Sequence, residues 1–348
     1  MVNMATLDGG VLQCAAACDD WLYVGDSDGA LRAFHCVGAP EDRAIDLSSA
    51  NWTAQVSDAG DALLCLCAVR DPRANASHAL IAAGCADGAV VFYRNHTETR
   101  RLRLPHAVTS LLAIGDLQFV ATDAFGHLYG LTLYDVTWQL AATDSEGFYA
   151  RTTATVRLLD IEGTLSTYVL VALWDRPLLL VTQRDRVVAT IATSTPIRSI
   201  LSVPSAQGED VVLVAGHDGS VSRVRTVRSP KTMSSPSQED KFEIIIELVT
   251  RVDIAIRKIV AVQAANSLPS ATPSERVSWL VLGEDGQIVG FEGGEQVEKW
   301  STLLPLAAER EESICDTVIL RRNEAVDVCV LRGRQIHRYS MSAQSSAQ

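Results

Sequence analysis

The side chains best suited to chemistry are spread thinly along this sequence. Its histidines occur singly, without His-x-x-x-His spacing, at His35, His78, His96, His106, His127, His217 and His337. The most closely spaced cysteines are Cys65 and Cys67, which would share one face of a strand and could form half of a metal site. Because buried thiols usually pack as small apolar groups, we favour packing over metal binding for this pair.

Aspartate followed by glycine recurs along the chain, at Asp28, Asp87, Asp218 and Asp285. A ring of carboxylates would suit calcium binding or acid–base chemistry. Aspartate is also a favoured turn residue, and one aspartate per turn would keep the carboxylates apart. Neither Gly-x-Ser-x-Gly nor Gly-x-x-x-x-Gly-Lys occurs. We therefore predict no catalytic, cofactor-binding or metal-ligating residues, and no enzymatic activity.

The charge balance argues against nucleic acid as a partner. Lysine and arginine total 30 against 42 acidic residues, and the resulting net charge of −12 repels phosphate backbones. The densest basic group consists of Arg94, Arg100, Arg101 and Arg103. Contact of this group with RNA or an acidic protein is the minor interpretation.

No part of the sequence predicts insertion into a membrane. The closest apolar stretch, residues 168–181, is interrupted by Asp175, Arg176 and Pro177, and the first residues lack a basic region followed by an apolar one. The eight cysteines fall mostly inside apolar runs, which suits reduced thiols. We expect a cytoplasmic protein, with the cilium and nucleus left open.

A repeated hairpin is the most informative structural signal. Short β-branched runs end in a tight Asp-Gly or similar turn and are followed by a second apolar run, in residues 21–34, 80–93, 119–131, 211–224 and 279–291. Two further hairpins, residues 168–182 and 325–339, lack the Asp-Gly pair. Asp-Gly tolerates the positive φ of hairpin turns at both positions. A glycine before the pair permits close backbone approach, at positions 25, 84, 216 and 283.

Each hairpin has a β-like run before it, and most have another after it, which makes four strands per unit. The runs are more apolar than alternating, as expected for strands covered on both faces. Seven such units predict an all-β fold, a seven-bladed β-propeller of four-stranded antiparallel blades. Residues 2–7 precede the first unit and are expected to act as an N-terminal strand closing the last blade.

The propeller is expected to occupy residues 1–340 as a single domain, followed by a disordered tail, residues 341–348. Polar, proline-containing segments near 228–241 and 266–276 predict disordered insertions within two blades. Ser229 and Ser235 each precede proline and are candidates for phosphorylation, although an unmodified loop is the favoured interpretation. Residues 303–312 are expected to form one short helix or turn.

At the hairpins the chain resembles the WD-repeat propeller superfamily in a degenerate form. The family carries Trp-Asp five residues past the turn glycine, and here the Trp position holds Phe34, Tyr93, Leu131, Val224 and Phe291. The segment Leu104–Leu111 resembles the usual entry to a blade. The chain also resembles quinoprotein-like propellers, which place a tryptophan on the outer strand about a dozen residues past the turn glycine, as in Gly126 to Trp138 and Gly286 to Trp300.

The resemblance implies a non-catalytic protein–protein interaction scaffold that is a subunit of a hetero-complex with other proteins. Trafficking or ciliary coats, ribosome-assembly factors and ubiquitin-ligase adaptors all use such folds. Two alternatives stay open: an enzyme of quinoprotein-like type that uses a central channel, and a recognition module for a modified or acidic peptide. The last would require a cluster of arginines or aromatic side chains on one face. No cofactor is expected.

Overall fold

The computed structural model describes most of the chain, as β-strands joined by turns. The described residues are 3–6, 10–36, 50–71, 79–115, 117–141, 150–160, 162–174, 176–205, 208–228, 242–262, 278–292, 295–303, 314–322, 325–332 and 335–342. Within these ranges no helix is long and apolar enough to span a membrane.

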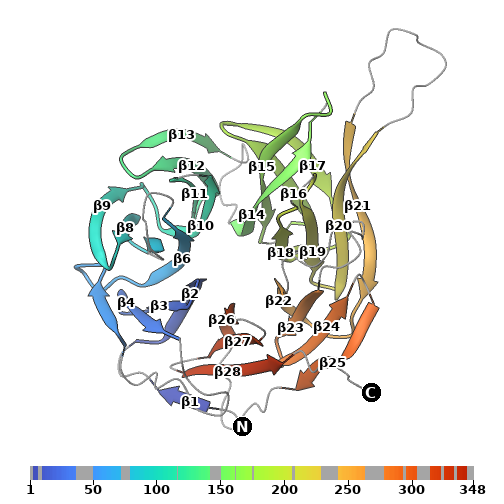
Figure 1. Cartoon of the computed structure of the whole chain (residues 1–348). Helices are drawn as coiled ribbons and strands as arrows, with labels where there is room; N and C mark the ends of the chain where they lie inside the picture. Colours follow the sequence, from blue (N-terminus) through green and yellow to red (C-terminus); the bar gives the residue numbers. More distant parts are fainter. Residues whose placement is uncertain are drawn as a thin grey trace, which may run out of the picture. The chain divides into compact units, whose positions relative to one another are not determined.

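The strands belong to two compact units, residues 1–141 with 307–348, and residues 142–306. The described strands pair into seven four-stranded sheets, four in the first unit and three in the second (Figure 1). Within each sheet the strands pair in an antiparallel manner with their neighbours in sequence, apart from β1, which pairs with β28.

The first unit contains sixteen of the strands. Its sheets are β2 (Leu12–Cys18), β3 (Trp21–Asp26), β4 (Ala30–His35) and β5 (Trp52–Gln55); β6 (Leu63–Arg70), β7 (Ala79–Cys85), β8 (Ala89–Arg94) and β9 (Thr97–Arg103); β10 (Val108–Gly115), β11 (Gln118–Asp123), β12 (His127–Thr132) and β13 (Val136–Ala141); and β26 (Ile314–Arg322), β27 (Ala325–Arg332) and β28 (Gln335–Ser342) with β1 (Asn3–Thr6).

The second unit contains three sheets of the same plan. They are β14 (Ala150–Leu159), β15 (Leu165–Leu173), β16 (Leu178–Gln183) and β17 (Arg186–Ala192); β18 (Ile197–Val203), β19 (Val211–Gly216), β20 (Ser220–Arg228) and β21 (Phe242–Arg251); and β22 (Ile256–Ala261), β23 (Ser278–Gly283), β24 (Gln287–Glu292) and β25 (Glu295–Leu303).

The predicted single ring of seven blades requires a correction. The all-β class and the four-stranded sheet are as expected, but the sheets are divided between two units, one of four sheets and one of three. A repeat in the sequence predicts the structure of the repeated element, here a four-stranded sheet. It does not report which repeats pack into one compact body, because each repeat contacts only its neighbours.

The N-terminal residues pair where the sequence predicted. Strand β1 lies antiparallel to β28, with Asn3 opposite Arg338 and Thr6 opposite Gln335. This pairing supplies the fourth strand of the sheet that contains β26 and β27. Strand β28 continues to Ser342, so the first two residues of the predicted tail are strand.

Burial follows the position of a strand in its sheet. Every residue of the second strands β7 and β19 is buried, whereas the fourth strands β9 and β13 are mostly exposed. A strand covered on both faces requires a continuous apolar run, which explains why the hairpin sequences show little alternation. The core lies between neighbouring sheets; for example, Val156 and Leu170 of one sheet pack with Val212 of the next.

The turn glycines have positive φ, but the aspartates before them do not, which corrects the expected turn type. Gly29 has a φ of 78° and Gly88 a φ of 88°, and neither Asp28 nor Asp87 is left-handed. The Gly88 N–H donates to the Cys85 carbonyl three residues earlier, at 3.2 Å. This is the geometry of a type I turn followed by a left-handed glycine, the second most common hairpin connection.

Every first strand carries a β-bulge near its start. Between the first two pairs of the ladder, the first strand advances by two residues while its partner advances by one. The skipped residues are Gln13, Leu64, Thr109, Arg151, Arg198, Arg257 and Cys315. A bulge re-aims one side chain, so this repeated irregularity sets the direction of one residue per sheet.

Several predicted segments lie outside the described residues. These are most of the two expected insertions, Ser229 and Ser235, residues 304–312 of the expected helix, and residues 343–348 of the tail. The first insertion connects β20 to β21, whose ladder is paired up to Arg228 and Phe242.

Candidate functional site

The cysteine pair is packed as a structural element. Cys65 is buried, and its thiol donates to the Val108 carbonyl of the next sheet at 3.4 Å. Cys14 makes the same contact one sheet earlier, with the Leu63 carbonyl at 3.5 Å. Burial raises the pKa of Cys67 to about 12, so its thiol is protonated at neutral pH and is a poor metal ligand.

The aspartates before the turn glycines stay in separate turns. Asp87 accepts a hydrogen bond from the Ala89 N–H at 2.9 Å, and Asp285 accepts one from the Gln287 N–H at 3.0 Å. Asp218 accepts from both the N–H and the hydroxyl of Ser220. Each of these three carboxylates therefore stabilises its own turn, as aspartate commonly does.

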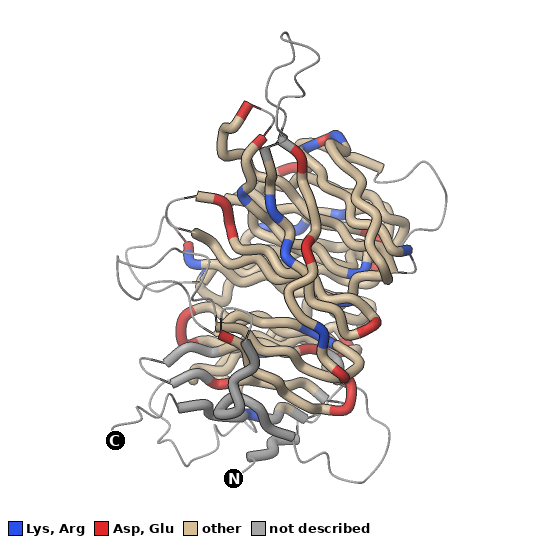
Figure 2. Tube along the Cα trace, turned by 90° about the vertical axis from the view of Figure 1, so that its right-hand side faces the viewer, with Lys and Arg blue, Asp and Glu red and all other residues tan. Residues whose placement is uncertain are grey.

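The dense basic segment does not act as one patch, because its arginines have separate local partners. Arg101 pairs with Glu98 at 2.9 Å, and Arg103 pairs with Asp87 at 3.3 Å. Arg100 donates to a backbone carbonyl at 3.2 Å, and Arg94 forms an ion pair at 2.5 Å. Figure 2 shows basic and acidic positions interspersed along the trace.

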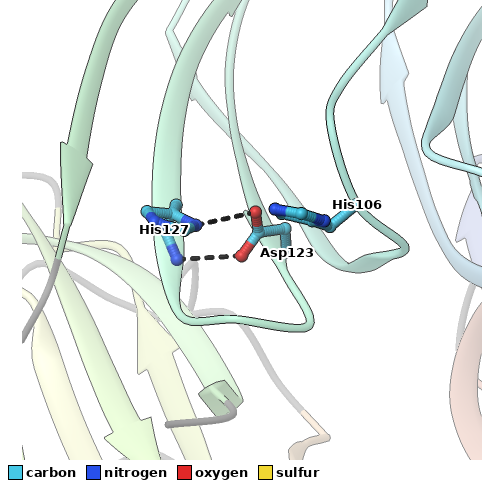
Figure 3. A group of neighbouring side chains, drawn as sticks. All are labelled: His106, Asp123 and His127. Carbon is cyan, nitrogen blue, oxygen red and sulfur yellow. Dashed lines mark hydrogen bonds and ion pairs between the residues drawn. The ribbon is translucent and has the colours of Figure 1, made fainter. Parts of the chain in front are cut away.

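Among the described residues, one group of three side chains has donor atoms close enough to hold a metal ion. His106, Asp123 and His127 place one donor atom each within 4.8 Å of one another. Figure 3 shows that Asp123 lies between the two imidazoles and bonds to His127 through both carboxylate oxygens. The backbone N–H of His127 donates to Oδ1 of Asp123 at 2.9 Å, and the imidazole Nδ1 of His127 lies 2.9 Å from Oδ2 of Asp123. Sequence spacing did not reveal this group, because strand β10 and most of β11 lie between His106 and Asp123.

The same group is better explained as part of a hairpin. Asp123 is fully buried and also accepts bonds from the Phe125 N–H and the Tyr129 hydroxyl, both at 2.9 Å. Asp26 occupies the matching position in another sheet and accepts from residues two, four and six positions later, the last being Arg32. The Asp123 carboxylate is likewise satisfied by donors from its own turn and the following strand, β12.

A second cluster arises from the bulges of the second unit. The bulged residues of β14, β18 and β22 are Arg151, Arg198 and Arg257. Strand β18 lies between the other two and contacts both. The arginine is the second residue of its strand in all three sheets. We call Arg151, Arg198 and Arg257 the arginine cluster.

The three cations influence one another. All three side chains are partly buried. The pKa of Arg151 is lowered to about 10, first by burial and then by the charges of Arg198 and Arg257, while Glu284 opposes this effect. Glu284 lies in the turn between β23 and β24, and its carboxylate is 3.5 Å from the Arg198 guanidinium. Arg151 is therefore a partly desolvated cation beside two further cations, Arg198 and Arg257.

An aromatic side chain completes the cluster. Trp174 follows β15 directly and is 58% exposed, which is unusual for so large an apolar group. The Arg151 guanidinium lies 3.8 Å from the centre of the Trp174 ring, within cation–π distance. In the first unit the bulge positions hold Gln13, Leu64, Thr109 and Cys315, so this combination belongs to the second unit.

Comparison with solved structures decides the fold. The chain is similar to the β-propeller domain of Cps50 (Swd1) from Myceliophteria thermophila, with 12% identity, a TM-score of 0.63, and coverage of 99% of this chain and 100% of that one. The chain has a β-propeller fold. It is also similar to Chaetomium thermophilum Sqt1 bound to the N-terminus of ribosomal protein L10, with 15% identity, a TM-score of 0.63, and coverage of 97% and 85%.

A third similar structure is BBS1N in complex with ARL6DN, at 12% identity, a TM-score of 0.62, and coverage of 97% of this chain and 94% of that one. No protein-family model and no curated protein matches the sequence. At identities this low the likeness concerns the fold, and function must be argued from the residues of this chain.

The sheets form without a Trp-Asp motif. The positions that hold tryptophan in WD repeats are all core positions here: Phe34, Tyr93, Leu131, Val224 and Phe291 are each at most 3% exposed. Any apolar side chain of suitable size can fill such a position, so the sheets form without the motif.

Proposed function

We propose that this chain is a non-catalytic, protein-binding subunit of a multiprotein assembly. One observation carries the proposal: the exposed Trp174 ring lies against Arg151, beside Arg198 and Arg257. Tryptophan and arginine are the residues most enriched among those that dominate the energy of protein interfaces. An exposed indole next to partly desolvated cations gains favourable burial when a partner covers it.

The similar structures support this proposal by analogy. BBS1N is described in complex with ARL6DN, and Sqt1 is bound to the N-terminus of ribosomal protein L10. Several side chains that could do chemistry have structural partners among the described residues. Asp123, Asp87 and Cys65, for example, each stabilise a turn or a contact between sheets.

The test is affinity purification of the tagged full-length protein from its own cells, followed by mass spectrometry. We expect a fixed set of proteins in near-stoichiometric amounts. Trp174→Ala should reduce their recovery about tenfold, the usual effect of losing a central interface tryptophan. The matched control is Tyr134→Ala, which removes an aromatic side chain that is 62% exposed in the first unit.

Two outcomes would overturn the proposal. In the first, the wild-type protein elutes without stoichiometric partners. In the second, partners are recovered equally well with Trp174→Ala and with Tyr134→Ala, which would remove the surface that carries the argument.

A further inference from the structure

The arginine cluster exists because one structural irregularity is repeated. In regular strands, side chains alternate between the two faces of a sheet. The bulge breaks this alternation at the same place in β14, β18 and β22, and each time the re-aimed residue is an arginine. Strand β18 contacts both β14 and β22, and the charges of Arg198 and Arg257 act on Arg151, so the three side chains lie near one another.

The charge of this region calls for an anion. Arg198 has a carboxylate partner, Glu284, but at 3.5 Å and with Glu284 45% exposed the pair is loose. Arg151 lies against the neutral face of Trp174. Burial first, and then the charges of Arg198 and Arg257, lower the pKa of Arg151, and an added anion would favour its charged form.

The chemistry of the region selects the kind of anion. The net charge of −12 would repel a long polyanion such as nucleic acid, whereas a short acidic segment interacts mainly with the local field. Guanidinium groups bind carboxylates through paired hydrogen bonds in a fixed planar geometry. Glu284 already presents a carboxylate to Arg198, which shows that the cluster accommodates this group.

We propose that the arginine cluster binds a short acidic segment of a partner protein, in which aspartate or glutamate carboxylates contact Arg151, Arg198 and Arg257 and a neighbouring apolar residue covers Trp174. The inference rests on the proposed function and names the partner chemistry for the same surface. Glu284 occupies part of the cluster in the free protein, so the incoming carboxylates compete with it.

The experiment measures binding of the full-length protein to a fluorescent peptide of about ten residues that contains aspartate, glutamate and one leucine. The variant Arg151→Gln/Arg198→Gln/Arg257→Gln should weaken binding at least about tenfold, because it removes three charge-assisted contacts. A control of equal charge change, Arg70→Gln/Arg100→Gln/Arg103→Gln, removes arginines of the first unit and should change the dissociation constant by less than about twofold.

A second variant is expected to bind the acidic peptide more tightly, a result that loss of the fold could not give. Glu284→Gln removes the competing carboxylate, so it should tighten binding of the acidic peptide about threefold to tenfold. A damaged fold cannot produce this result. Thermal melts of each variant identify loss of binding that follows from unfolding.

Four outcomes would overturn the inference, three in the peptide assay and one in cells. The first is no binding of the acidic peptide by the wild-type protein, and the second is equal binding by the cluster variant and its control. The third is at least tenfold tighter binding of a phosphoserine peptide of equal charge, which would make the site a phosphate site. If the cluster variant still recovers the wild-type set of partners from cells, the inference fails while the proposed scaffold function stands.

Discussion

Arg338 and Asp327 form a buried ion pair that joins β28 to β27. The guanidinium approaches the same carboxylate oxygen through two nitrogens, at 2.9 Å and 2.5 Å. Their side chains are only 8% and 1% exposed, so solvent screens the pair weakly. Because β28 also pairs with β1, this contact helps to hold the sheet in which the two ends of the sequence meet.

Replacing Arg338 with methionine should therefore be costly. Asp327 would keep a buried negative charge without its guanidinium partner, and we expect the free energy of unfolding to fall by about 3–5 kcal/mol. Urea unfolding measures this change. Arg70→Met is the control: its pair with Asp19 is largely exposed, and its loss should cost about 1 kcal/mol or less. Equal losses in the two variants would show that burial does not strengthen the Arg338 pair.

Gly130 should not tolerate a side chain. A Cβ at this position would lie 2.0 Å from Nε1 of Trp138, which is directly opposite on β13. Gly130→Ala would force the indole to move, at a cost of about 1–3 kcal/mol for overpacking. Gly208→Ala is the control, because no atom lies within 4 Å of its added Cβ. Thermal melts compare the two, and equal melting temperatures would contradict the prediction.

The Asp123 carboxylate should matter for stability and not for metal binding. Asp123→Ala leaves two backbone N–H groups, an imidazole and a hydroxyl without their acceptor, and should lower the free energy of unfolding by about 2–4 kcal/mol. Zinc titration of the wild-type protein should leave its melting temperature unchanged. A zinc-dependent increase that disappears in His106→Ala would instead establish a metal site.

Stability should decrease at high pH, and Tyr93 should contribute to the decrease. Burial raises the pKa of Tyr93 from 10.0 to about 12, so the folded state holds the phenol proton more tightly than the unfolded chain. Its contribution is complete below a pH of about 10 and is lost as the pH rises through about 12. Tyr93→Phe should flatten the fall in melting temperature between about pH 9.5 and 11.5. An unchanged slope would show that Tyr93 does not carry this effect.

The local sequence was enough to predict each strand–turn–strand hairpin, but it predicted few contacts between residues far apart in the chain. Apolar runs around Gly84 and Gly88 predicted a buried strand, a turn and a second strand, because strand burial and turn geometry depend on nearby residues. The close approach at Gly84 was also predictable, and its absent Cβ would lie 2.6 Å from Cys65 Sγ. The turn type was not, since left-handed geometry falls on Gly88 alone.

The tertiary structure decided which distant residues meet. His106 and Asp123 carry no recognisable spacing, and only the pairing of β10 with β11 brings them together. The division into two units was equally hidden, because a repeat has the same sequence signature whichever neighbours it packs with.

The arginine cluster lies between these two cases. The sequence contains Arg151, Arg198 and Arg257 at the second position of three β-like runs, so an alignment of the repeats could have revealed the pattern. What it could not reveal is the bulge, which depends on how each strand is paired with its neighbour. Sequence thus determined the residue types and their period. Strand pairing and sheet packing decided that three like charges and one exposed indole share a surface, because those contacts join residues far apart along the chain.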